Sequence, residues 1–211
     1  MKDYEKLSKA HFNGQAAEYD RNESIHYSKY PKISCKNVSG LLADKSFAKL
    51  LDIGCGTGYL IDMLKKQHKD TVYYGLDLSP EMLKNAKKKF DDSVYLKEGS
   101  AMELPYDNNC FDIVTCIQSF HHYPDPEKAM AEAYRVTAHG GLYILSDTGC
   151  GGAIKWIENH MLLKMANTGD YQVSSRQDME KLMKSAGFEI VKSEQIEKMI
   201  YTVVGKKPSA K

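Results

Sequence analysis

A glycine-rich turn and a distant aspartate supply the clearest chemical signal in the sequence. Segment 51–60 reads LDIGCGTGYL, in which an apolar run enters closely spaced glycines and a helix is expected to begin directly afterwards. Glycine lets the backbone turn tightly and lets a ligand lie against it, and the free N–H groups of a helix start attract a carboxylate or phosphate. Asp77 ends the next apolar run, one β-α-β unit further on, where an acid accepts hydrogen bonds from the two hydroxyls of a ribose. Alone, the glycines could form an ordinary turn and Asp77 could cap a helix; together they predict a nucleoside site.

A pair of histidines supplies the second signal. His121 and His122 follow the apolar run 111–117, in the segment QSFHHYP. An imidazole can take up or release a proton near neutral pH. We therefore predict a catalytic or substrate-contacting role for His122, and favour His121 less. The alternative is that both rings only pack at the start of a helix.

Short apolar runs that alternate with segments of helical period must position these residues. Strand-like runs rich in β-branched and aromatic residues occupy 49–54, 71–77, 93–98, 111–117 and 141–146. Helical patterns lie between and after them, one introduced by Ser79 and Pro80 and one closed by Gly187. Such alternation predicts an α/β fold, a doubly wound parallel sheet with helices on both faces. The runs 188–195 and 199–204 lie too close together for a helical crossover, so they are expected to form an antiparallel hairpin at the sheet edge.

The chain is expected to be one domain with two appended segments. Residues 1–45 are expected to form an N-terminal helical lid segment, 46–205 the nucleoside-binding domain, and 206–211 a polar tail. Within the domain, 147–174 is expected to be a helical insertion. Its helix is apolar nearly all round, through Ile154, Trp156, Ile157, Met161, Leu162, Leu163 and Met165. We expect burial of this helix in the domain; a lid over the pocket or a dimer contact is the alternative.

Composition limits the classes of partner. The chain has 211 residues, with 29 basic and 28 acidic side chains and a net charge of +1, which does not favour a nucleic-acid partner. No apolar run is long enough to span a membrane, and no apolar leader is visible at the start, so a cytoplasmic location is expected. The five cysteines are scattered without a C-x-x-C pair, and no carboxylate cluster suggests magnesium. No metal site is therefore predicted.

The motifs together resemble the class I S-adenosylmethionine-dependent methyltransferases. The string DIGCGTG in 52–58 and the string DLSPEML in 77–83 carry the resemblance, and 98–106, 111–114 and 135–142 extend it. The segment FNGQAAEYD at 12–20 is similar to the N-terminal helix of the small-molecule branch, the group of ubiquinone and menaquinone biosynthesis. The resemblance implies a Rossmann-like seven-stranded sheet of order 3-2-1-4-5-7-6, S-adenosylmethionine as cofactor, and methyl transfer to a small molecule.

The resemblance also implies roles for individual residues. Gly54, Cys55 and Gly56 would line the methionine and ribose end, Asp77 would hold the ribose, and Leu78 would pack on the adenine. The remaining cofactor contacts are expected from Tyr19, Ser100, Ala101 and Gln118. Tyr19 could equally pack beneath its own helix.

Two residues depart from the family pattern. Ser100 stands where the family often has an acid facing the adenine, which would weaken that contact or leave it to the backbone of Ala101. His139 stands where a proline is usual, which is expected to affect only the turn.

Other functions remain open from the sequence. A non-catalytic S-adenosylmethionine-binding subunit or regulator would keep the fold without turnover. A nicotinamide-dependent oxidoreductase would need G-x-G-x-x-G, and Tyr59 stands where the third glycine would fall. The acceptor and its reacting atom have no readable motif, and a monomer or a homodimer is expected.

Overall fold

The apolar runs form one seven-stranded sheet, as expected. The computed structural model describes residues 2–21, 29–90, 92–163 and 168–210. Its strands are β1 (Lys49–Ile53), β2 (Val72–Asp77), β3 (Val94–Glu98), β4 (Phe111–Ile117), β5 (Thr137–Thr148), β6 (Glu189–Glu197) and β7 (Ile200–Lys206). The order is β3-β2-β1-β4-β5-β7-β6, with β1 to β5 parallel and β7 antiparallel to both of its neighbours. The predicted order and the predicted hairpin are confirmed, although β5 begins earlier than expected.

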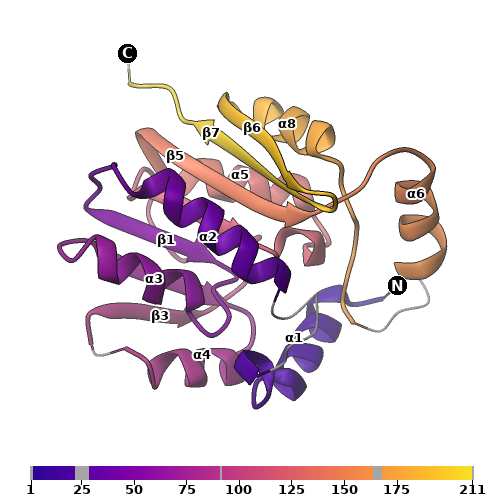
Figure 1. The fold of residues 1–211 in the computed structure, drawn as a ribbon, viewed down its shortest axis with the longest axis horizontal. Helices are drawn as coiled ribbons and strands as arrows, with labels where there is room; N and C mark the ends of the chain where they lie inside the picture. The colour runs from indigo at the N-terminus through magenta and orange to yellow at the C-terminus, as the bar shows by residue number, and fades with distance from the viewer. Residues whose placement is uncertain (1, 22–28, 91, 164–167, 211) are drawn as a thin grey trace.

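Helices fill the crossovers between the strands and cover both faces of the sheet (Figure 1). They are α1 (Tyr4–Gln15), α2 (Tyr30–Leu42), α3 (Tyr59–Gln67), α4 (Pro80–Lys87), α5 (Pro126–Val136), α6 (Gly152–Ile157) and α8 (Arg176–Ser185), with 3-10 turns η1 (Tyr19–Arg21) and η3 (Phe120–His122) and a π-helical turn η4 (Glu158–Leu162). Ser79 caps α4 as predicted, because its hydroxyl accepts a hydrogen bond from the backbone N–H of Met82. No helix within the described residues is long and apolar enough to cross a membrane.

Successive residues of a strand belong to two separate hydrophobic cores, one on each face of the sheet. On β1, Leu50 joins the core beneath α2 and α3, whereas Leu51 joins the core beneath α5 and α8. On β5, Ile144 and Leu145 divide in the same way. Both faces of the sheet are therefore packed, and the carboxyl ends of the parallel strands are left as the place where a ligand can be held.

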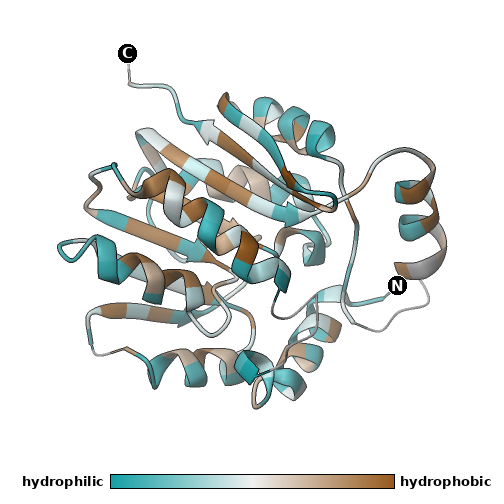
Figure 2. Cartoon of the chain, viewed as in Figure 1, coloured by the Kyte–Doolittle hydropathy of each residue, from teal (hydrophilic) through white to brown (hydrophobic). Residues whose placement is uncertain are grey.

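The burial expected for the apolar insertion helix is wrong. On α6, Ile154 is 59% exposed and Trp156 is 58% exposed. Figures 1 and 2 show α6 beyond the ends of the strands, away from both faces of the sheet. Both faces are already covered by other helices. Met165 and the side chain of Leu162 lie outside the described residues. A lid or a dimer contact remains a prediction for this helix.

Candidate active site

The glycine turn between β1 and α3 has the geometry that its sequence predicts. Gly54, Gly56 and Gly58 have φ values of +72°, +53° and +77°, a region that L-residues with side chains seldom occupy. A Cβ on Gly54 would lie 2.1 Å from the hydroxyl of Ser119, so close packing also requires glycine there. At Gly56, by contrast, a Cβ would meet nothing within 4 Å. The turn therefore leaves open space above Gly56, beside the start of α3.

Asp77 is held rigidly beside this turn. Its carboxylate accepts hydrogen bonds from the backbone N–H of Gly56 at 2.7 Å and of Ser79 at 2.8 Å. The two bonds go to different oxygens, so each oxygen keeps an acceptor position for a further donor. Burial raises the pKa of Asp77, while the backbone donors of Ser79 and Gly56 lower it. The arrangement suits two vicinal hydroxyls that approach from the cavity.

One cavity at the carboxyl ends of the strands is lined by His122 and by every residue that was predicted to bind the cofactor. Its lining includes Tyr19, Gly54, Cys55, Gly56, Asp77, Leu78, Ser100, Ala101, Gln118 and His122. These residues come from η1, the glycine turn, the end of β2, the loop after β3 and the segment after β4. The structure brings the predicted site residues together; their individual roles remain predictions.

This chain lacks the acid that the family often has at position 100, and a carboxylate from α1 lies beside Ser100 instead. The hydroxyl of Ser100 donates to the Glu5 carboxylate at 2.6 Å, and both residues line the cavity. Nearby bonds fix α1 over this end of the sheet, because Ser79 Oγ donates to Asn13 at 2.6 Å and the Asn85 amide donates to the Ala16 carbonyl at 2.6 Å. Sequence reasoning missed Glu5, since nothing along the chain connects it with Ser100.

Asp52 is a second carboxylate that sequence reasoning left out. It lies in β1 and lines the cavity, and it is only 3% exposed. Thr115 donates a hydrogen bond to it at 2.7 Å. Burial raises its pKa to about 7, with a smaller contribution from the charge of Asp77. A buried carboxylate in a strand beside a cavity suits a cationic ligand group, and its place directly before the glycine turn was the signal available in the sequence.

Gln118 occupies a strained position at the end of β4. Its φ of +49° is unusual for a residue with a side chain. Its side-chain amide donates to Ser34 at 2.9 Å, and its amide oxygen accepts from the hydroxyl of Thr148. The side chain is thus held between α2 and β5 while it faces the cavity.

A second cavity of about 350 Å³ adjoins the first. Five residues line both cavities: Phe12, Tyr19, Pro31, Gln118 and His122. The second cavity is also lined by residues from the insertion and the segment after it, among them Cys150, Glu158, Leu163 and Asp170. Tyr19 lines both cavities, and its ring also lies 6.3 Å from that of Phe12; a contact of Tyr19 with the cofactor remains a prediction.

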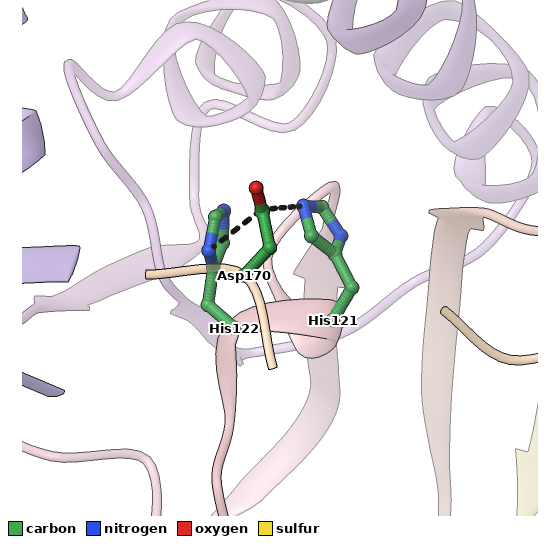
Figure 3. A group of neighbouring side chains, drawn as sticks. All are labelled: His121, His122 and Asp170. Carbon is green, nitrogen blue, oxygen red and sulfur yellow. Dashed lines mark ion pairs between the residues drawn. The ribbon is translucent and has the colours of Figure 1, made fainter. Parts of the chain in front are cut away.

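The histidine pair belongs to a charged cluster in the second cavity (Figure 3). His121 Nδ1 lies 2.6 Å from Asp147, a residue that is 1% exposed, and Asp170 lies 3.2 Å from His122 Nδ1. Burial lowers the pKa of His121, but the charges of Asp147 and Asp170 outweigh burial and raise it to about 9. Burial, followed by the charge of His121, lowers the pKa of His122 to about 3. The pKa values of the two neighbouring rings are therefore shifted in opposite directions.

Asp170 reaches this cluster because the chain returns to it after the insertion. The backbone N–H groups of Tyr171 and Gln172 donate to the His121 carbonyl at 2.9 and 3.1 Å. Gly169, at φ +87°, packs so closely on α1 that a Cβ would lie 2.4 Å from the backbone nitrogen of Ser8. The segment is thus fixed between η3 and α1, and Asp170 faces both rings.

The sheet order, the glycine turn and the Asp77 carboxylate beside it are typical of a Rossmann-like fold of the methyltransferase type. Residues 51–145 match the family described as "Methyltransferase domain". These matches make the chain similar to the class I S-adenosylmethionine-dependent methyltransferases, in particular to enzymes of the menaquinone and ubiquinone group. The cofactor of this family is S-adenosylmethionine.

Similar proteins of known name come from several bacteria. Demethylmenaquinone methyltransferase of Lactiplantibacillus plantarum is 34% identical over 143 residues, which cover 65% of this chain and 60% of that protein. The Thermus thermophilus protein of the same name is 36% identical over 108 residues, covering 50% of this chain and 49% of that protein. The 27-O-demethylrifamycin SV methyltransferase of Amycolatopsis mediterranei is 34% identical over 115 residues, covering 52% and 42%. The matches thus span between about two fifths and three fifths of these relatives.

Solved structures share the fold across nearly the whole chain. A chain from the complex between the Haloferax volcanii Trm112 methyltransferase activator and a methyltransferase superposes with a TM-score of 0.82 at 18% identity, covering 97% of this chain and 99% of that chain. A methyltransferase from Thermotoga maritima gives a TM-score of 0.71 at 22% identity, covering 94% and 99%. The expected fold class is confirmed by these neighbours.

Proposed function

We propose that this protein transfers a methyl group from S-adenosylmethionine to a small-molecule acceptor. The observation that carries the proposal is the junction of the two cavities. The first cavity holds the turn and the carboxylate that suit the cofactor, and the second, of about 350 Å³, has the size of a small-molecule site. His122 and Gln118 line both, so a methyl group leaving the first cavity would enter the second beside them.

The residues that line the first cavity can be matched to the chemical groups of the cofactor. The hydroxyls of its ribose would donate to Asp77, and its ammonium group would pair with Asp52. The adenine would lie between Leu78 and the loop of Ser100 and Ala101, with the Glu5 carboxylate able to accept from the exocyclic amine. Each of these residues lines the cavity and provides either a hydrogen-bond acceptor or an apolar surface.

The transfer itself needs alignment more than it needs reactive side chains. The nucleophile of the acceptor attacks the methyl carbon, the carbon–sulfur bond breaks, and sulfur keeps the electron pair as a neutral thioether. The protein would hold the two reactants in line and exclude water. The predicted catalytic residue, His122, would act on the acceptor, because it lines both cavities at their junction.

Two further expectations are kept as proposals. The relatives are named for small-molecule acceptors, a quinone precursor and an antibiotic, and we carry over only the class of a small organic acceptor. A cytoplasmic location and a monomeric or homodimeric state are predictions from the sequence.

Thermal unfolding with added ligand tests the proposal. S-adenosylmethionine should raise the melting temperature, whereas NAD should not, because binding to the folded state alone stabilises it. Asp77→Ala should weaken cofactor affinity by about 10- to 100-fold, the value of losing hydrogen bonds to a charged group. Asp70→Ala removes an exposed carboxylate from a turn and serves as the matched control. An equal response of both variants would reject the ribose contact.

An assay of catalytic turnover distinguishes an enzyme from a cofactor-binding regulator. A methyltransferase should release S-adenosylhomocysteine only when a suitable acceptor is present. A protein that binds the cofactor tightly but releases none with any acceptor in a broad panel of phenols, quinols, carboxylic acids and amines would be a cofactor-binding regulator.

A further inference from the structure

The side chains of His121, His122 and Asp170 converge on one point of the second cavity. Asp170 Oδ1 lies 3.2 Å from His122 Nδ1 and 3.5 Å from His121 Nε2, and the three ligand atoms all lie within 4.8 Å of one another (Figure 3). Ligands bound at 2.0–2.2 Å in a tetrahedron around Zn²⁺ lie about 3.3–3.6 Å apart. The two distances from Asp170 are therefore close to those of a metal-ligand set, and the two histidine nitrogens lie within 4.8 Å of each other.

The buried nitrogen of His122 gives an independent indication of a ligand. His122 is 9% exposed, and its Nδ1 has no hydrogen-bond partner among the described residues. The nearby Asp170 oxygen is at ion-pair distance but does not form a hydrogen bond with it. Because an unsatisfied buried polar atom costs about 1–3 kcal/mol, this nitrogen requires an explanation, and a bound cation would supply one.

The surroundings resemble the outer shell of a metal site. Asp147 Oδ1 accepts from His121 Nδ1 at 2.6 Å, which leaves His121 Nε2 directed at Asp170. Asp147 is fixed in turn by the backbone N–H groups of His121 at 3.0 Å and Thr148 at 2.7 Å. The second oxygen of Asp170 accepts from the hydroxyl of Thr168. Metal-binding histidines typically carry such a carboxylate on the other ring nitrogen, which fixes their tautomer and orientation.

We propose that His121, His122 and Asp170 bind a divalent transition-metal ion of the Zn²⁺ type in the acceptor cavity. Two imidazoles and one carboxylate favour such an ion over Mg²⁺ or Ca²⁺, which prefer oxygen ligands. The site departs from the sequence analysis, which predicts no metal, because Asp170 follows the insertion and no spacing motif connects it with the histidine pair.

The site also specifies a class of acceptor, and this step rests on the proposed methyl transfer. Three protein ligands leave a coordination position open to the cavity. A hydroxyl oxygen of the acceptor would occupy it, and the ion would lower the pKa of that hydroxyl. The hydroxyl would lose its proton to solvent as the acceptor enters the cavity, before the reactants are enclosed; its oxygen would then attack the methyl carbon, and the carbon–sulfur bond would break with its electron pair on sulfur. The acceptor class is therefore a phenol, enol or hydroxy acid.

Metal titration of the full chain tests the site directly. After chelator treatment, calorimetry with Zn²⁺ and visible absorption with Co²⁺ should show one equivalent bound, with the d–d bands of a site that has nitrogen and oxygen ligands. His122→Ala and Asp170→Asn should each weaken binding by at least 100-fold, and Asp147→Asn by about 10- to 100-fold. His139→Ala is the control, because this exposed histidine bonds the Pro208 carbonyl away from the cavity.

The cofactor response keeps the outcomes separate. A variant that still melts cooperatively and is still stabilised by S-adenosylmethionine has kept its fold, so a loss of metal affinity in that variant reflects a change at the metal site alone. If His122→Ala unfolds, the nearly isosteric Asp170→Asn takes its place in the test. Binding of less than 0.2 equivalent, or equal affinity in wild type, His122→Ala and Asp170→Asn, would overturn the metal site while leaving the methyltransferase proposal intact. Metal binding without any stabilisation by S-adenosylmethionine would support the metal site and overturn the methyltransferase proposal.

Discussion

The two cavities are built in different ways although they share a wall. The cofactor cavity is made mainly from consecutive strand ends, where the turn after β1 and the end of β2 are tied by backbone bonds from Gly54 and Cys55 to Leu76 at 2.8 and 3.0 Å. The second cavity, which we propose for the acceptor and call the acceptor cavity, is assembled from α1, η3, the insertion and the segment that carries Asp170. One site is therefore fixed by the sheet itself, whereas the other depends on segments that cover the sheet.

This difference predicts that cofactor binding and acceptor handling can be damaged separately. A change in the glycine turn should disturb both folding and cofactor binding, because the same backbone serves both. A change in the acceptor cavity should leave the sheet and the cofactor site intact. The variants below test the cofactor side of that separation, beginning with the largest effect, and the variants of His122 and Asp170 described above test the other side.

Gly54→Ala should produce the largest loss. The new Cβ would lie 2.1 Å from Ser119 Oγ and 3.1 Å from the hydroxyl of Tyr123, at a φ of +72° that disfavours alanine. We expect a loss of about 1–3 kcal/mol in the free energy of unfolding and a loss of cofactor affinity of about 100-fold or more, which at 1.4 kcal/mol per tenfold is about 3 kcal/mol. Urea denaturation and calorimetric titration with S-adenosylmethionine measure the two effects.

Gly40→Ala is the matched control for that substitution. Gly40 lies within α2, and a Cβ there would meet nothing within 4 Å. Alanine should stabilise the helix by about 0.5–1 kcal/mol without changing cofactor affinity. If Gly54→Ala behaved like Gly40→Ala, the turn would not be the constrained element of the cofactor cavity.

The same difference explains how far the sequence alone could predict the structure. The strand runs, the hairpin and the glycine turn depend on local patterns that are visible in the chain, and the strand order followed from the family resemblance that those motifs carry. Glu5 and Asp170 could not be placed, because their partners lie far away in sequence and meet them only through the docking of α1 and the return of the chain after the insertion. The exposure of α6 was mispredicted, since its apolar composition says nothing about whether a sheet face is still free.

Asp52→Asn should alter the pH dependence of cofactor binding. Burial raises the pKa of Asp52 to about 7, and the ammonium of the cofactor would favour the ionised form. Affinity should therefore fall below pH 7 by up to about tenfold per pH unit, and Asp52→Asn should flatten this dependence and bind more weakly at pH 8. Titration calorimetry from pH 6 to 8 measures both; equal slopes in the two proteins would argue against the ion pair.

The stability of the cofactor-free protein should change with pH in the opposite sense. Since the folded-state pKa of Asp52 lies above the unfolded value of about 4, its contribution is fully present below pH 4 and is lost as pH rises through about 7. The wild type should thus lose stability relative to Asp52→Asn between pH 6 and 8 when no cofactor is present. Chemical denaturation of both proteins at each pH checks this sign.

Glu5→Ala should produce the smallest loss, because Glu5 reaches the cofactor cavity from α1 and not from the sheet. Its carboxylate is positioned by the hydroxyl of Ser100 at 2.6 Å, so the two side chains should act as one unit on the adenine. We expect about three- to tenfold weaker cofactor binding for Glu5→Ala, and little further loss in the double variant with Ser100→Ala, since contacting residues do not contribute additively. Glu18→Ala, which removes an exposed partner of Arg21, should leave affinity unchanged. Additive losses for Glu5 and Ser100 would mean that the N-terminal helix only covers the cofactor cavity and does not complete it.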